Sequence, residues 1–168
     1  EWLNKYTFPN ESLFSDDSHC ERESKVFLDL LNKNGITTTV SFGSVHVNSV
    51  EYLFREAHNR NMCVIAGNVL MDRNAPNTVL EKADKSYLNS KEIIDRWHNV
   101  GRCKYAITPR FAITSTPELM EVSQSLIEEN NSCYIQTHLS ENIDEIKTTL
   151  ELFPEHKNYL SIYDKYKL

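Results

Sequence analysis

The sequence contains few glycines and no long apolar run. Four glycines occur among its 168 residues, and neither a GxGxxG nor a GxxxxGK[ST] motif is present. The glycine-rich loops that hold phosphates in dinucleotide- and nucleotide-binding folds are therefore missing. The apolar runs are about five or six residues long, whereas roughly 20 are needed to span a bilayer. We expect no membrane segment and no membrane partner.

Clustered positive charge is also missing. The chain has 18 Lys and Arg against 24 Asp and Glu, a net charge of −6 and a sequence pI near 5.5. The densest basic pair is Lys165 with Lys167. Proteins that hold nucleic acid through its phosphates need a denser cluster, so we expect no nucleic-acid partner.

Cysteines are few and widely spaced. Cys20, Cys63, Cys103 and Cys133 form no CxxC motif, and three of them lie in apolar, strand-like runs. A free thiol in such a run behaves as a small hydrophobic side chain. We therefore predict reduced, buried cysteines and a cytoplasmic location, with disulfides or a structural zinc site as the alternatives.

The remaining composition is that of a globular protein. With 40% hydrophobic and 25% charged residues, the chain can bury a core, and we expect residues 1–168 to form a single domain. Residue 1 is Glu rather than Met, so we expect that the N-terminus is processed or that the chain is cut from something longer.

Strand-like and helix-like runs alternate four times. The strand-like runs are residues 36–42, 62–66, 103–108 and 132–137. A helix is predicted after each of them, and another precedes the first strand, where Val26, Phe27, Leu30 and Leu31 recur at helical spacing. Residues 68 to about 89 are predicted to be a polar loop.

Punctuating residues predict two helix ends. Thr116 is a capping residue, followed by proline at the first helical position and an acidic residue in the first turn. Gly101 is predicted to stop the helix that carries Ile93, Ile94 and Trp97.

This order predicts a parallel α/β sheet, for which two architectures are open. One is an open doubly wound sheet and the other is part of a (β/α)8 barrel. The missing phosphate-binding motifs favour the barrel. A whole barrel needs about 250 residues, so four βα units correspond to roughly half of one.

His138 and Glu141 follow the fourth predicted strand directly. Functional residues of parallel α/β proteins gather where strands end. A histidine there can bind a metal, and a carboxylate three residues later can move a proton of an attacking water. The structural alternative is that His138 ends the sheet and Glu141 favours the helix dipole.

Arg110 and Phe111 occupy the same position after the third strand. The guanidinium suits a carbonyl, carboxylate or phosphate, and the phenyl ring offers a stacking face. Alternatively, Arg110 is a surface residue paired with an acid beside a core Phe111. Residues 71–76 either line a pocket at this rim or form a turn in which Asp72 pairs with Arg73.

Five blocks in matching order resemble the guanine deaminase family of the zinc amidohydrolase superfamily. The blocks are YTFP (6–9), GNVLMDRNAP (67–76), YAITPRFA (105–112), THLSEN (137–142) and LFPEHK (152–157). The resemblance implies a (β/α)8 TIM-type barrel, of which this chain supplies about strands 2 to 5 with their helices. It also implies hydrolytic deamination of guanine to xanthine and ammonia.

The resemblance also implies roles for individual residues. His138 looks like a zinc ligand, and Glu141 looks like the proton shuttle between the attacking water and the purine ring. Arg110 and Phe111 look like contacts to the purine carbonyl and the base, and the substrate site extends over residues 138–141 with Leu139 and Ser140. Zn²⁺ is the implied cofactor and guanine the implied small-molecule partner.

Part of the family's metal site has no counterpart here. The H-x-H pair of the first strand is expected upstream of Glu1, and the later His and Asp are expected after Leu168. We therefore expect the chain to be a central part of the enzyme, inactive by itself and self-associating as a homo-oligomer through its open sheet edges. The alternatives are a non-catalytic interaction module on the same scaffold and an amidohydrolase that acts on another aminopurine or a pterin.

Overall fold

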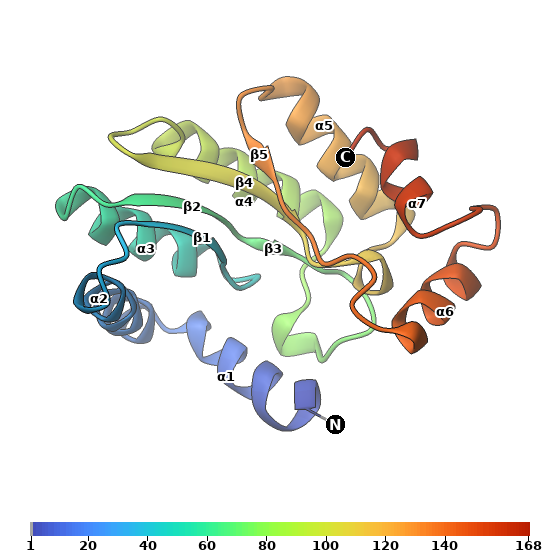
Figure 1. Cartoon of the computed structure of the whole chain (residues 1–168), viewed down its shortest axis with the longest axis horizontal. Helices are drawn as coiled ribbons and strands as arrows, with labels where there is room; N and C mark the ends of the chain where they lie inside the picture. The colour runs from blue at the N-terminus through green and yellow to red at the C-terminus, as the bar shows by residue number, and fades with distance from the viewer. Residues whose placement is uncertain (1) are drawn as a thin grey trace.

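A computed structural model describes residues 2–168 of the chain (Figure 1). In chain order its helices and strands are α1 (Phe8–Ser12), α2 (Asp17–Lys33), β1 (Thr38–Phe42), α3 (Val47–Asn59), β2 (Cys63–Gly67), β3 (Val69–Leu70), α4 (Ala83–Trp97), β4 (Cys103–Pro109), α5 (Pro117–Glu129), β5 (Tyr134–Ile135), α6 (Ile143–Leu152) and α7 (Leu160–Lys165). A π-helical turn covers Leu3–Thr7, and 3-10 turns cover Leu13–Ser15, Asn77–Val79 and Ala112–Thr114.

The strands form one parallel sheet whose neighbours follow one another along the chain. β1 pairs with β2, β2 with β4, and β4 with β5. β3 continues β2 beyond Asn68: Ala66 pairs with Tyr105 and Val69 pairs with Thr108, so the register against β4 is the same on both sides of the break. The sheet is thus four strands wide and sequential in order.

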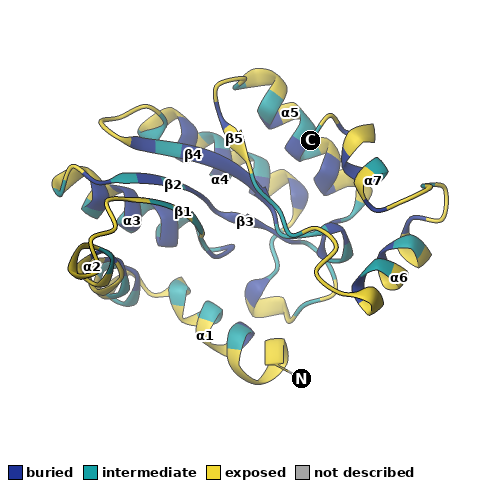
Figure 2. Cartoon of the chain, in the orientation of Figure 1, coloured by how far each residue is buried: buried dark blue, intermediate teal, exposed yellow. Residues whose placement is uncertain are grey.

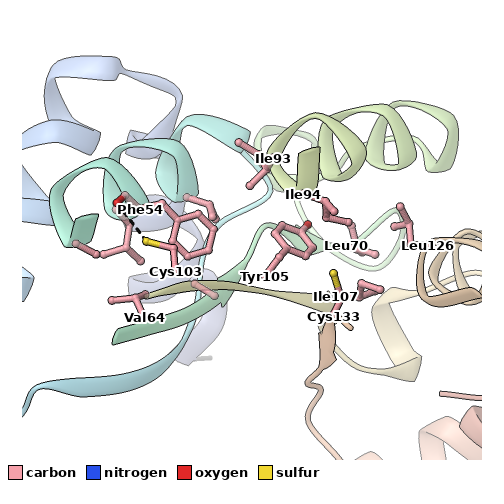
Figure 3. Close-up of a cluster of buried hydrophobic side chains, with 14 of the residues drawn as sticks. Phe54, Val64, Leu70, Ile93, Ile94, Cys103, Tyr105, Ile107, Leu126 and Cys133 are labelled. Atoms are coloured by element: carbon pink, nitrogen blue, oxygen red, sulfur yellow. Dashed lines mark hydrogen bonds between the residues drawn. The ribbon is translucent and has the colours of Figure 1, made fainter. Parts of the chain in front are cut away.

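Helices α3, α4 and α5 cover one face of this sheet, and the main core lies between them and the strands (Figure 3). Alternate residues of β4, including Cys103, Tyr105 and Ile107, are buried in that core. The outer strands β1 and β5 carry the exposed residues of the sheet, as the colours in Figure 2 show, and Val40 on β1 is 61% exposed.

This arrangement confirms the predicted fold class, a partial (β/α)8 barrel. Neighbouring strands are sequential, all pairs are parallel, and the helices that cover the sheet lie on one face. An open doubly wound sheet would carry helices on both faces, so that alternative is wrong.

Two predicted strands are longer than the observed ones. Gly35 has a positive φ of 74° and Ile36 donates its amide to Leu31 O (2.9 Å), so the turn that ends α2 takes up the residues before Thr38. Cys133 closes a turn by donating to Asn130 O (2.9 Å), which leaves β5 only two residues.

The predicted loop over residues 68–89 is partly wrong, because β3 and the first half of α4 lie within it. The first turns of α4 are largely polar, and one side of them is buried. Glu81, whose side chain is 8% exposed, accepts a hydrogen bond from Asn89 (2.8 Å) and lies 3.2 Å from Lys85. Ser86 and Ser90 on this helix are buried. Because these buried side chains are polar, the hydrophobic pattern of the sequence did not predict a buried helical face here.

Helix ends were predicted with mixed success. Thr116 caps α5 as predicted, accepting a hydrogen bond from the amide of Leu119 (3.2 Å). Gly101 does not end α4. The helix ends at Trp97, Asn99 takes the left-handed conformation (φ 66°), and Gly101 follows in the next turn. After glycine, asparagine is the residue most often found in the left-handed position that ends a helix. The sequence pattern indicated Gly101 and did not indicate Asn99.

The helix predicted before the first strand is present as α2, but it has two apolar sides. Its buried side carries Cys20, Ser24 and Leu28, whereas Leu30 is 54% exposed. The four cysteines are free thiols, and Cys20, Cys103 and Cys133 are buried as predicted, whereas Cys63 is only half-buried. None of the helices within residues 2–168 is both long and apolar enough to cross a bilayer.

His98 makes the stability of this fold sensitive to acid. The backbone N–H of Tyr105 donates to His98 Nδ1 (2.9 Å), and Nε2 lies 3.1 Å from Ser132 Oγ. The ring must therefore be neutral at Nδ1. Burial and, second, the charge of Lys104 lower the pKa of His98 below its usual value.

We predict that the free energy of unfolding falls as the pH is lowered from about 7.5 to about 5.5. In the unfolded chain His98 takes up a proton at its ordinary pKa, whereas in the folded chain it does so only at a lower pH. The stability that His98 contributes is therefore fully present above the ordinary pKa and is lost as the pH falls below it. Urea unfolding of wild type and His98→Gln at both pH values measures the effect. The variant should show a smaller loss, and an equal loss in both proteins would contradict the role of His98.

Candidate active site

The predicted site residues lie at the carboxyl end of the sheet, where β4 and β5 finish. Arg110 follows β4 directly, and its amide donates to Leu70 O (3.1 Å). Beyond β5, the amide of His138 donates to Arg110 O (2.9 Å), which continues the strand pairing past the last regular residue. This backbone bond brings together two sequence blocks that are 28 residues apart.

A pocket of about 760 Å³ opens at this edge. Its lining includes Arg110, Phe111, His138 and Glu141, together with the N-terminal segment of the chain and the start of α6. Leu139 and Ser140 are exposed turn residues outside the lining, and Ser140 has a positive φ of 57°. The structure thus unites four of the six predicted substrate-site residues around one pocket and assigns the other two to the turn that connects them.

The ring of His138 is held in one orientation. Nδ1 lies 2.9 Å from Arg110 O, and since a carbonyl only accepts, Nδ1 carries the hydrogen. The lone pair is then on Nε2, the nitrogen left for a metal, and an Nδ1–H bonded to a carbonyl is the usual support for a histidine that binds zinc. The rings of Phe42 (4.5 Å between centroids) and Phe111 (6.3 Å) flank the imidazole.

Glu141 begins the turn into α6, and its backbone is fixed while its side chain is exposed. The amide of Glu141 donates to Glu145 Oε2 (2.8 Å). Glu145 is buried and forms a capping box with Asn142. Within residues 2–168 the Glu141 carboxylate accepts no hydrogen bond and forms no ion pair. Its oxygens are therefore available to accept hydrogen bonds from a molecule in the pocket.

Two buried tyrosines from the C-terminal part of the chain, Tyr159 and Tyr163, support this turn. The sequence pattern did not indicate either of them. Glu145 Oε1 accepts a hydrogen bond from Tyr159 (2.8 Å). The Tyr163 hydroxyl accepts from the amide of Ala112 (3.0 Å) and lies 3.3 Å from His138 O. Burial raises the pKa of Tyr163, so its hydroxyl stays protonated and can donate to that carbonyl.

Arg110 is neither free nor on the surface. Its Nη1 lies 2.8 Å from both carboxylate oxygens of Glu11, and its guanidinium carbon lies 5.4 Å from the ring centroid of Phe8. Both partners belong to α1, which the sequence analysis did not connect to the site. The block YTFP, which contributed to the family resemblance, carries Phe8.

The loop after β3 braces the loop after β4. Asp72 accepts hydrogen bonds from the amide (2.9 Å) and hydroxyl of Thr116, and Arg73 donates to Ala112 O (2.9 Å) and Ile113 O (3.1 Å). In the described chain these two side chains thus bond to other segments rather than forming the predicted Asp72–Arg73 turn. The other alternative for residues 71–76, that they line a pocket, is correct in part, since Asn74 lines the pocket.

His138 is the one imidazole among residues 2–168 that lines this pocket. In residues 2–168 no three side chains of His, Cys, Asp or Glu come close enough to hold a metal ion. His138 Nε2 suits one position of a zinc site, which needs three or more protein ligands. A complete zinc site therefore requires ligands that the described chain does not supply.

The chain resembles known proteins over its whole length. It is 50% identical over 168 residues to guanine deaminase of Escherichia coli, covering 100% of this chain and 38% of that protein. The solved structure of the Escherichia coli enzyme superposes with a TM-score of 0.98, covering 99% of this chain and 39% of that chain. The chain thus spans about 38% of the length of this curated relative.

Other solved structures agree. Guanine deaminase of Clostridium acetobutylicum, described with guanine bound in the active site, is 33% identical with a TM-score of 0.95, covering 99% of this chain and 40% of that chain. Atrazine chlorohydrolase of Arthrobacter aurescens, described in complex with zinc, is 19% identical with a TM-score of 0.73, covering 88% and 34%, and shows the fold alone.

The family match covers nearly all of the part that carries the site. The amidohydrolase family matches residues 12–168, a range that includes the whole sheet and Arg110, Phe111, His138 and Glu141. The chain belongs to the amidohydrolase family.

Proposed function

We propose that this chain is the central part of a zinc-dependent guanine deaminase, which hydrolyses guanine to xanthine and ammonia. The observation that carries the proposal is the pocket in which Arg110, Phe111, His138 and Glu141 meet at the carboxyl end of the sheet. The identity to guanine deaminases supports the choice of substrate. The guanine bound to the Clostridium enzyme supports it as well.

Arg110 and Phe111 bind and orient the base. In the proposed complex the guanidinium donates to the purine carbonyl, and the Phe111 ring packs on the base. The Glu11 and Phe8 contacts fix where the guanidinium can reach. Orientation places the amino-bearing carbon toward His138 and Glu141.

Glu141 moves the protons. Water adds to the amino-bearing carbon, and Glu141 takes one of its protons and delivers it to the ring nitrogen. Glu141 then takes the second proton from the hydroxyl of the adduct and delivers it to the departing amino group. The carbon–nitrogen bond breaks, ammonia leaves and a carbonyl remains, so atoms balance. His138 is one ligand of the zinc in this proposal; zinc, when bound, supplies a water molecule of lowered pKa.

The test uses a longer protein that carries this sequence and the 168-residue chain by itself. The longer protein should convert guanine to xanthine, followed by absorbance and by ammonia release, and the chain alone should not. Conversion by the chain alone would contradict the role of ligands outside it. Turnover of another aminopurine or of a pterin, with guanine untouched, would show that the proposed substrate is wrong.

His138→Asn in the longer protein should lower both the zinc content and the deaminase rate, because the amide cannot replace the imidazole as a ligand. We expect a loss of activity of at least about 100-fold. His58→Asn, a change at an exposed histidine of α3, is the control and should leave both values at the wild-type level. Full zinc content in His138→Asn would refute the metal role.

We also propose that the chain by itself forms homo-oligomers and that the protein is cytoplasmic. The exposed Val40 and Phe42 on β1, which pairs on one side with β2, support association. The four free thiols support a reducing compartment.

A further inference from the structure

The single basic side chain of Lys or Arg type that lines the pocket in residues 2–168 is already paired. Arg110 is 11% exposed and Glu11 20% exposed, and Nη1 contacts both oxygens of the carboxylate at 2.8 Å. The pair is largely removed from water, so the carboxylate cancels much of the field that the guanidinium would otherwise send into the pocket.

The other charged groups of the lining are acidic. Glu141 just before α6 and Asp144 and Glu145 in its first turn contribute carboxyl groups, of which the buried Glu145 carboxylate is bonded to Tyr159 and to the Glu141 amide. An unpaired arginine offers a bidentate fork that suits a carboxylate or phosphate. Here Nη1 of Arg110 is already bonded to Glu11. An anion that enters the pocket would meet three acidic side chains and an arginine whose charge is partly neutralised by Glu11.

Nitrogen atoms of Arg110 other than Nη1 keep their hydrogens for a ligand. Among the described residues only Glu11 accepts a hydrogen bond from the guanidinium. A neutral carbonyl oxygen needs donors but brings no net charge, so it gains the hydrogen bond without opposing the acids around it. The charged side chains that residues 2–168 contribute to the pocket therefore favour a neutral ligand with a carbonyl over an anion.

We propose that Glu11 is a specificity-determining residue, which tunes Arg110 to bind the neutral lactam carbonyl of a purine and to disfavour anions, including the ionised product. The inference rests on the proposed function. Deamination replaces an amino group by a carbonyl with an adjacent acidic N–H, so the product is a stronger acid than the substrate. The Glu11 carboxylate thus permits binding of the neutral substrate. Once the product has ionised, the same carboxylate weakens its binding and promotes its release.

The experiment compares two purines that differ in charge. At mildly alkaline pH xanthine is largely a monoanion and hypoxanthine is largely neutral, and both carry the lactam carbonyl. Dissociation constants are measured by calorimetry for both ligands with the zinc-loaded longer protein. The variants are Glu11→Gln, which removes the charge, Glu11→Asp, which keeps it, and Glu121→Gln, which removes an exposed charge from α5.

In Glu11→Gln the ratio of the xanthine constant to the hypoxanthine constant should fall by about tenfold, as expected for one charge near the ligand at an intermediate dielectric. Glu11→Asp and Glu121→Gln should keep the wild-type ratio. An unchanged ratio in Glu11→Gln, with both ligands still bound, overturns the inference and leaves the proposed function intact.

A second probe separates this inference from the proposed function. If the wild type binds neither purine, the proposed function has failed, and inorganic phosphate then decides the role of Glu11. Tighter phosphate binding by Glu11→Gln than by the wild type supports the inference, and equal binding overturns it.

Discussion

Glu141→Gln should reduce the deaminase rate of a longer protein carrying this chain by about 10³-fold, the loss typical of a missing general acid–base group. Glutamine keeps the size and the hydrogen-bonding capacity of the side chain but cannot hold a proton. The backbone contacts of residue 141 are unaffected, because the amide of Glu141 donates to Glu145 whatever the side chain. The fold and the zinc content should therefore be unchanged.

The measurement is kcat for guanine together with zinc content. Glu151→Gln provides a matched control, since this exposed acid lies near the other end of α6. It should retain wild-type turnover. A rate for Glu141→Gln within a few-fold of the wild type would remove Glu141 from the proton path, while a loss of zinc along with the rate would assign it a structural role instead.

Gly67→Ala should lower the free energy of unfolding by about 3 kcal/mol, the upper part of the usual range for an overpacked core. A methyl group at this position would lie 1.7 Å from Ala106 O and 2.9 Å from Thr108 Oγ1. The first of these is a backbone atom of β4, so the clash cannot be relieved by rotating a side chain. β2 and β4 would have to move apart next to the strand end that carries Arg110.

Gly35→Ala separates this steric effect from the general cost of replacing a glycine. A methyl group at Gly35 would meet nothing within 4 Å, but the residue has a φ of 74°. Left-handed backbone in a non-glycine residue costs about 1 kcal/mol. Urea unfolding of both variants gives the comparison, and equal losses would show that the close approach of β2 and β4 is not what requires Gly67.

Periodicity and strand ends were sufficient to predict the framework. The strands around Val40, Val64 and Tyr105 are rich in β-branched, aromatic or other apolar residues, and in a parallel sheet their carboxyl ends must meet at one edge. The approach of Arg110 to His138 follows from that geometry, because Arg110 comes directly after β4 and the segment after β5 continues its pairing as far as His138.

The contacts that complete the site could not be predicted in the same way. Glu11 and Arg110 are 99 residues apart, and Tyr163 reaches the site from α7. Such partners are chosen by tertiary packing rather than by a local pattern. The start of α4 was missed for a related reason: Ser86 and Ser90 are polar in the sequence but buried in the structure, where Ser90 lies within hydrogen-bond distance of Asn68 (3.3 Å).

The span of 99 residues between Glu11 and Arg110 also bears on how the molecule folds. Each strand pairs with a neighbour close to it in the chain, so the sheet and its helices form through short loop closures of low entropic cost. The contact of α1 with the end of β4 closes a longer loop than any of the strand pairs, and the turn held by Tyr163 depends on α7. We therefore expect the hydrophobic core to form before the pocket at Arg110 is complete.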